Sequence, residues 1–73
     1  MDWGKIVGTN VRRLRVERKL TQEQLAHDAE IDLTYVGGIE RGRRNPSVSV
    51  LGRLAEALQV HPRDFFAELE DAH

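Results

Sequence analysis

Residues 22–41 read QEQLAHDAEIDLTYVGGIER, and the spacing of their small and apolar side chains decides the fold. Two short helices that meet steeply after a tight turn need apolar residues at fixed places and a small residue where their backbones nearly touch. Counted from Gln22, the apolar places are 4, 8, 10, 15 and 18, and the small place is 5. All of these places are matched, by Leu25, Ala26, Ala29, Ile31, Val36 and Ile39. We therefore predict one helix over residues 22–28 and a second over residues 33–41.

Capping residues mark the ends of these two helices. Thr21, followed three residues later by Gln24, fits a capping box at the start of the first helix. Asp32 is a favourable N-cap for the second helix, and Gly42 follows that helix where glycine is favoured. The pair of helices is therefore delimited by local signals as well as by its apolar pattern.

Helical periodicity also extends to both sides of this pair. Asp2 can cap a helix over residues 3–19, and Ser47 can cap a fourth helix that follows the loop 42–46. Apolar residues recur at steps of three and four in both segments, which is the pattern of a helix with one buried face. The stripes are Trp3, Val7, Val11 and Leu14, and then Leu51, Leu54, Ala55 and Leu58.

A fifth helix is expected over residues 62–70. Pro62 suits the first position of a helix, and Asp64 places a negative charge in its first turn, where the helix dipole favours it. No segment alternates in the way of a half-buried strand. We therefore predict a single all-α domain of five helices over residues 1–73.

Composition excludes several classes of function. The 73 residues include no cysteine, so disulfides and thiolate metal sites are excluded, and the three histidines lack metal-ligand spacing. No glycine-rich phosphate loop follows a strand, no stretch is apolar enough to span a membrane, and no signal peptide opens the chain. We expect a cytoplasmic protein that is not an enzyme and has no metal, no cofactor, no membrane contact and no small-molecule effector.

Charge is divided unevenly along the chain. The formal net charge is −1, but residues 1–44 carry +2 and residues 45–73 carry −3. A basic first half beside an acidic second half is compatible with binding a polyanion on one face.

Three stretches resemble a known family: LTQEQLA at 20–26, TYVGGIERGRRNPS at 34–47 and RLAEALQVHPRDFF at 53–66. They resemble the Cro and lambda-repressor type of helix-turn-helix protein, also called the XRE family, over about residues 6–69. The last two stretches are similar to small restriction–modification controller proteins. The family usually has glycine at place 9, where φ is positive, and this chain has Glu30, which costs on the order of 1 kcal/mol there.

The resemblance implies a lambda-repressor-like fold that binds double-stranded DNA and represses or activates transcription. The helix over 33–41 would lie in the major groove with Thr34 and Leu33 toward base edges. Gly37 and Gly38 are expected to face outward, where they remove direct readers and let the backbone come close. Contacts to the DNA backbone are expected from Gln22, Arg43, Arg44 and Asn45, and more weakly from Tyr35 and Arg12.

One ion pair is expected to serve the architecture instead of the DNA. In this family an arginine late in the first helix pairs with a glutamate near the end of the third. The matching residues here are Arg15 and Glu40. Such a pair would fix the third helix against the first.

A homodimer is expected, joined through the fifth helix at Val60, Phe65, Phe66 and Leu69. Neighbours on a helix diverge by about 100°, so only one of Phe65 and Phe66 can face the core. The alternative is that both phenylalanines pack on the first and fourth helices, with Trp3 filling the gap. A dimer would read two half-sites about 34 Å apart.

A second reading of the chain is a protein-interaction module, or an antitoxin, that uses the same fold. The acidic second half and the two glycines at 37 and 38 favour this alternative. The basic run 41–44 favours DNA.

Overall fold

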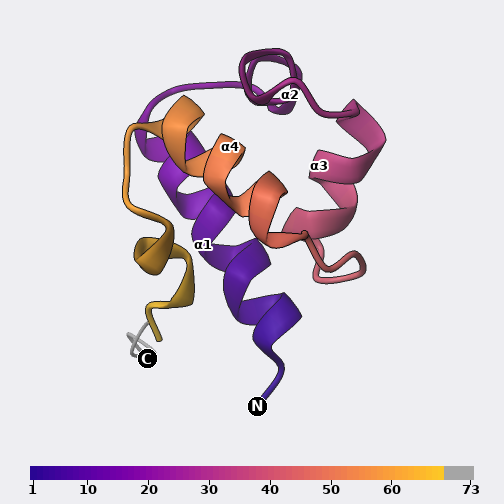
Figure 1. The fold of residues 1–73 in the computed structure, drawn as a ribbon, viewed down its shortest axis with the longest axis vertical. Helices are drawn as coiled ribbons and strands as arrows, with labels where there is room; N and C mark the ends of the chain where they lie inside the picture. Colours follow the sequence, from indigo (N-terminus) through magenta and orange to yellow (C-terminus); the bar gives the residue numbers. More distant parts are fainter. Residues whose placement is uncertain (69–73) are drawn as a thin grey trace.

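The computed structural model describes residues 1–68, which form four α-helices and one 3₁₀ helix with no strand among them. The elements are α1 (Trp3–Glu17), α2 (Gln22–Ala29), α3 (Leu33–Glu40), α4 (Val48–Leu58) and η1 (Pro62–Phe66). In Figure 1, α4 crosses in front of α1, α2 and α3 lie above and to the right, and η1 lies on the left beside α1. Within residues 1–68, no helix is both long and apolar enough to cross a membrane.

All four predicted N-cap residues are confirmed, and three of them make a capping hydrogen bond through the side chain. Asp2 accepts a hydrogen bond from the backbone of Lys5 at 3.1 Å, and Ser47 accepts one from that of Val50 at 3.1 Å. Thr21 and Gln24 form the capping box, with distances of 3.0 and 2.8 Å. Asp32 is the N-cap residue of α3, as predicted, but its side chain makes no capping hydrogen bond. The carboxylate of Asp32 is exposed, and α3 begins on its backbone carbonyl alone.

The turn between α2 and α3 has the strained backbone that the sequence predicts. Glu30 is in the left-handed region, with φ 58° and ψ 46°. The Ile31 amide donates to the Ala26 carbonyl at 3.0 Å, which closes the turn. Arg53 on α4 also donates to the Glu30 carbonyl at 3.2 Å. Long-range contacts therefore hold a conformation that non-glycine residues adopt at a cost.

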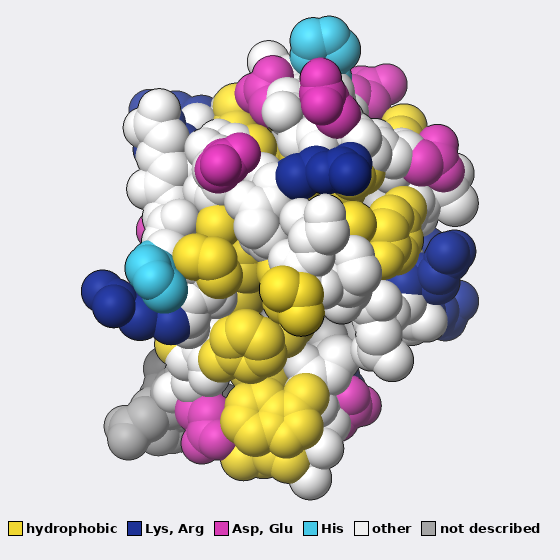
Figure 2. Space-filling view, in the orientation of Figure 1, with side chains coloured by type: hydrophobic (Ala, Val, Ile, Leu, Met, Phe, Trp, Pro, Cys, Tyr) yellow, Lys and Arg dark blue, Asp and Glu magenta, His cyan; other side chains and the backbone are white. Residues whose placement is uncertain are grey.

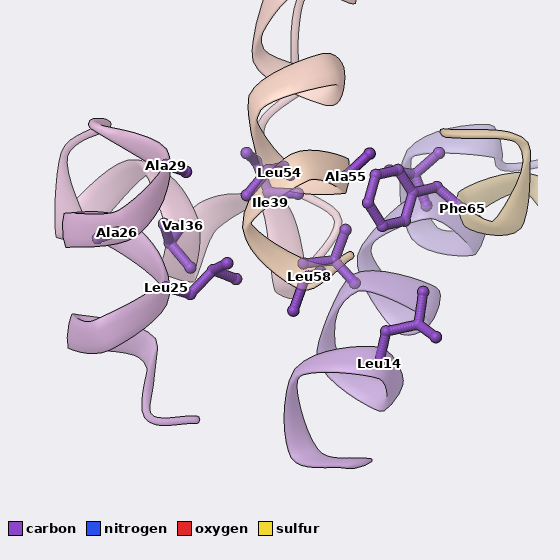
Figure 3. Close-up of a cluster of buried hydrophobic side chains, with 12 residues drawn as sticks. Leu14, Leu25, Ala26, Ala29, Val36, Ile39, Leu54, Ala55, Leu58 and Phe65 are labelled. Atoms are coloured by element: carbon purple, nitrogen blue, oxygen red, sulfur yellow. The ribbon is translucent and has the colours of Figure 1, made fainter. Parts of the chain in front are cut away.

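One apolar core lies between the helices and receives side chains from every element (Figure 3). Ile39 and Leu54 lie near the middle of the labelled group, with Leu25 and Val36 on one side and Phe65 on the other. Its buried members are Val7, Val11, Leu14, Leu25, Ala26, Ala29, Val36, Ile39, Leu54, Ala55, Leu58 and Phe65. All six positions that define the α2–α3 pattern belong to this core or pack against it. Trp3, which the stripe of α1 includes, is instead 49% exposed.

The fifth helix differs from the prediction. In place of the start of the predicted α-helix, the segment Pro62–Phe66 is a 3₁₀ helix, and the backbone at Ala67 is extended. Residues 69 and 70 of the predicted helix lie outside the described residues. The reason for the 3₁₀ helix is a contact with α1: the Asn10 side-chain amide donates to the carbonyl oxygens of Phe65, at 2.9 Å, and Ala67, at 2.7 Å. An α-helix would use the Phe65 carbonyl for its own ladder. Asn10 is 1% exposed and thus binds the end of η1 to α1.

The backbones of α1 and α3 approach each other closely at Gly8. A Cβ atom added to Gly8 would overlap the carbonyl oxygen of Ile39 and lie 2.9 Å from that of Glu40. Only glycine fits such a contact, because backbone atoms cannot swing aside as a flexible side chain can. By contrast, a Cβ atom on Gly52 in α4 would meet nothing within 4 Å.

We predict that Gly8→Ala lowers the free energy of unfolding by about 1–3 kcal/mol, because the added methyl group forces α1 and α3 apart. Gly52→Ala is the matched control, also in the middle of a helix, and should be neutral or stabilise by up to about 1 kcal/mol. Urea denaturation followed by circular dichroism measures both. Equal stabilities for the two variants would contradict the close approach.

Candidate nucleic-acid interface

The two sides of α3 have opposite environments. Val36 and Ile39 on the inner side are completely buried. On the outer side, Thr34 is exposed and Leu33 is 41% exposed. The C-terminal end of the helix continues into an exposed basic segment with Arg41, Arg43 and Arg44. The structure therefore brings Leu33 and Thr34 to the same outer surface as the basic segment.

Gly37 and Gly38 are buried, which corrects the expectation that their backbone is open to a partner. A Cβ atom on Gly37 would lie 3.2 Å from Nη1 of Arg41. One on Gly38 would overlap Cγ of Arg44 and lie 3.3 Å from its Cβ. The two arginine side chains thus occupy the space that the missing glycine side chains leave. Side chains on a helix lean toward its N-terminus, which explains why Arg41 covers the preceding turn.

Tyr35 completes this arrangement. The guanidinium carbon of Arg44 lies 5.0 Å from the centre of the Tyr35 ring, a cation–π geometry. The Tyr35 hydroxyl donates to the Asn45 carbonyl at 3.4 Å, which is long for a hydrogen bond. Tyr35, Arg44 and Asn45 were each predicted separately as DNA contacts, and the structure brings them together.

A network of buried polar side chains connects the end of α3 to α1 and α2. Arg15 donates to both carboxylate oxygens of Glu40, at 2.7 and 3.0 Å, and to the Leu20 carbonyl at 2.8 Å. The side chains of Arg15 and Glu40 are only 11% and 3% exposed. The pair that the resemblance implied is thus present as a bidentate contact, the geometry that fixes orientation best.

Gln22 belongs to this network and not to the outer surface. Its side-chain amide was expected to face a DNA phosphate, but it donates to Oε1 of Glu40 at 2.9 Å. A buried carboxylate with lone pairs left over is a strong acceptor, so it takes the nearest free N–H group. In this conformation the Gln22 amide connects α2 to α3.

Charged side chains of both signs lie on the face that Figure 2 shows. Acidic side chains and a histidine gather at its upper end, where Figure 1 places α2, and basic side chains lie on the right, beside α3, and also on the left. Arg12, which with Tyr35 is one of the two weaker predicted DNA contacts, is exposed on α1. It lines a shallow hollow there with Thr9, Arg13, Val16 and Glu17.

Comparison with known proteins gives consistent matches. Residues 11–65 match the model of a family described as helix-turn-helix. The HTH-type transcriptional regulator y4dJ of Sinorhizobium fredii is 48% identical over 60 residues, which are 82% of this chain and 78% of that protein. The control protein C.SmaI of Serratia marcescens is 45% identical over 82% of this chain and 71% of its own. The restriction-modification controller protein C.AhdI of Aeromonas hydrophila superposes with a TM-score of 0.84 at 43% identity, covering 86% of this chain and 96% of that one.

We predict that Glu40→Gln lowers the free energy of unfolding by about 3–5 kcal/mol, because it leaves the buried Arg15 guanidinium without a charged partner. The control is Glu17→Gln, which breaks the exposed Arg13–Glu17 pair at 3.2 Å and should cost less than about 1 kcal/mol. Chemical denaturation of both variants is the measurement. Similar losses from the two substitutions would show that the Arg15–Glu40 pair does not hold α3.

Proposed function

The chain belongs to the helix-turn-helix family, and we propose that this transcriptional regulator binds operator DNA as a homodimer, with α3 of each copy in the major groove. The helix-turn-helix unit is α2 and α3, over residues 22–41. In this geometry the second helix of the unit presents its outer residues to base edges, and the first crosses the backbone.

One observation carries the proposal: the exposed side of α3 is continuous with the exposed basic segment that follows it. Thr34 offers a hydroxyl to a base and Leu33 an apolar surface to a thymine methyl group. Arg43 and Asn45 extend beyond the helix end, where they reach the flanking phosphates. The buried network behind α3 fixes its orientation, which sequence recognition requires.

The homodimer is proposed from an exposed aromatic pair. Phe65 is completely buried, whereas Phe66 is 42% exposed and Trp3 49% exposed. The rings of Trp3 and Phe66 lie 6.2 Å apart at 56°, a tilted aromatic contact. Figure 2 shows an apolar band over α4 that widens at the lower end of the molecule, where Figure 1 places the start of α1.

An exposed apolar patch of this kind marks an interface in soluble proteins. Val60, which is half-buried, precedes η1 and belongs to the same proposed interface, and Leu69 lies outside the described residues. We therefore assign the dimer contact to Trp3 and Phe66, with Phe65 supporting it from the core.

We expect wild-type protein to enrich one sequence from a pool of random DNA duplexes. Arg43→Ala should weaken binding to every duplex alike and flatten the dependence of affinity on salt, because it removes a phosphate contact. Thr34→Ala should instead relax the preference at one base pair, by about 1–3 kcal/mol. Gel-shift titrations at several salt concentrations measure both effects. A wild-type protein that enriches no sequence would refute the proposed function.

We expect the wild type to sediment as a dimer at tens of micromolar and Phe66→Glu to sediment as a monomer, because a charge in the patch opposes its burial. Val16→Glu is the matched control, since Val16 is also apolar and 53% exposed, but on the outer side of α1. The control should stay dimeric. A dimer that survives Phe66→Glu with the fold intact would place the interface elsewhere.

A further inference from the structure

We propose that Gly38 and Tyr35 are positioning residues that hold Arg44 in one conformation on the outer face of α3, where its guanidinium reads a guanine. This inference rests on the proposed function, because it assigns a second base-reading side chain to the same surface. It also gives Arg44 a different role from its neighbour Arg43, although the two residues are adjacent in sequence and both are exposed.

The aliphatic part of the Arg44 side chain packs against the backbone at Gly38. The three atoms nearest to an added Cβ atom are Cγ, Cβ and Cδ of Arg44, the last at 3.6 Å. The Arg44 side chain is therefore the nearest neighbour in the space above Gly38. The backbone adds two further links, because the amides of Arg43 and Arg44 donate to the Gly38 carbonyl at 2.9 and 3.2 Å. The loop therefore folds back over this residue.

Tyr35 fixes the other end of the side chain. The ring sits 5.0 Å from the guanidinium carbon, so the charged group stacks on a half-buried aromatic surface. A long arginine loses much rotamer freedom when it binds a partner, and a side chain already held in place loses less. The stem on Gly38 and the head on Tyr35 together define one conformation for Arg44.

The position of this conformation points to base reading. Gly38 is four residues after Thr34, so both lie on the same side of α3, where Thr34 is exposed and the Arg44 side chain covers Gly38. Arg44 therefore lies beside the residue that faces the bases in the proposed complex. Bidentate contact of arginine with O6 and N7 of guanine is the commonest specific contact in the major groove. Within residues 1–68, the Arg43 side chain is not among the nearest atoms above any glycine and has no cation–π partner, as expected of a phosphate contact.

The first experiment needs no DNA. The Arg44 side-chain methylene protons should be shifted upfield in the NMR spectrum of the wild type by the ring current of Tyr35. Gly38→Ala should remove this shift, and Gly37→Ala should retain it, because its added methyl group meets Arg41 and not Arg44. Circular dichroism and urea denaturation of Gly38→Ala test whether the fold is kept while the Arg44 side chain moves aside. A retained shift in Gly38→Ala would overturn the proposal.

The second experiment measures coupling on the duplex that the wild type enriches from a random pool. Arg44→Ala should lose about tenfold to a hundredfold in affinity and its preference for guanine at one position. Gly38→Ala should lose as much, and the double variant no more than either single variant. Tyr35→Phe should keep the stacked ring and the affinity, whereas Tyr35→Leu should lose both.

Multiplicative losses from Gly38→Ala and Arg44→Ala would overturn the positioning role. An Arg44→Ala variant that weakens all duplexes equally would overturn the guanine assignment and make Arg44 a phosphate contact like Arg43. Failure of the wild type to enrich any duplex would instead overturn the proposed function, so the two failures are distinct.

Discussion

The position of α3 depends on one buried carboxylate. Glu40 accepts three N–H groups, two from Arg15 on α1 and one from Gln22 on α2. A buried charge is tolerated only when its partners and hydrogen bonds are complete, and this one is almost fully satisfied. Three helices are thereby joined through a single residue at the end of α3. The contact is directional, unlike the apolar packing around it, so it fixes how α3 is rotated as well as where it lies.

Close packing adds a second constraint at the same place. Gly8 lets the backbone of α1 approach that of α3 directly beside Glu40. The ion pair and the glycine therefore act on the same helix pair, one through charge and one through shape. Both act on the side of α3 that faces α1 and leave Leu33 and Thr34 exposed.

Much of this fold follows from short-range rules. The apolar places of residues 22–41, the capping box at Thr21 and the left-handed turn at Glu30 are all local, and the structure has each of them. The family that the sequence resembles is confirmed by the match over residues 11–65. The extent of the fifth helix was not predictable in this way, because Asn10 binds carbonyls more than fifty residues away in the chain. Asn10 falls on the apolar stripe of α1, three residues after Val7 and four before Leu14, and a polar residue in that register was an available signal.

The candidate site was predictable as a set of residues but not as an arrangement. The exposure of Leu33 and Thr34 follows from helical periodicity. The burial of Gly38 does not, because the side chain that covers it comes from beyond the end of the helix, and no periodic pattern connects 38 with 44. Gly37 differs, because Arg41 covers it at the helical spacing of four residues. Gln22 was misassigned for a reason similar to that at Gly38: its acceptor is eighteen residues away. The glycine at position 8, in the middle of a helix, was a sign of close backbone approach that sequence reasoning did not use.

The hydrogen bonds from Asn10 to the end of η1 affect how the two proposed interfaces are connected. Trp3, at the start of α1, contacts Phe66 in the exposed aromatic pair. Asn10, in the middle of α1, binds η1, and Arg15, near its end, binds α3. α1 thus connects the proposed dimer contact to α3, the proposed recognition helix, and hydrogen bonds of Asn10 and Arg15 fix it to η1 and α3. In the proposed dimer joined at Phe66, the length and orientation of α1 then set the distance between the two α3 helices. A dimer of this kind binds DNA best at one half-site separation, and any other separation requires the DNA to bend or twist, which costs free energy.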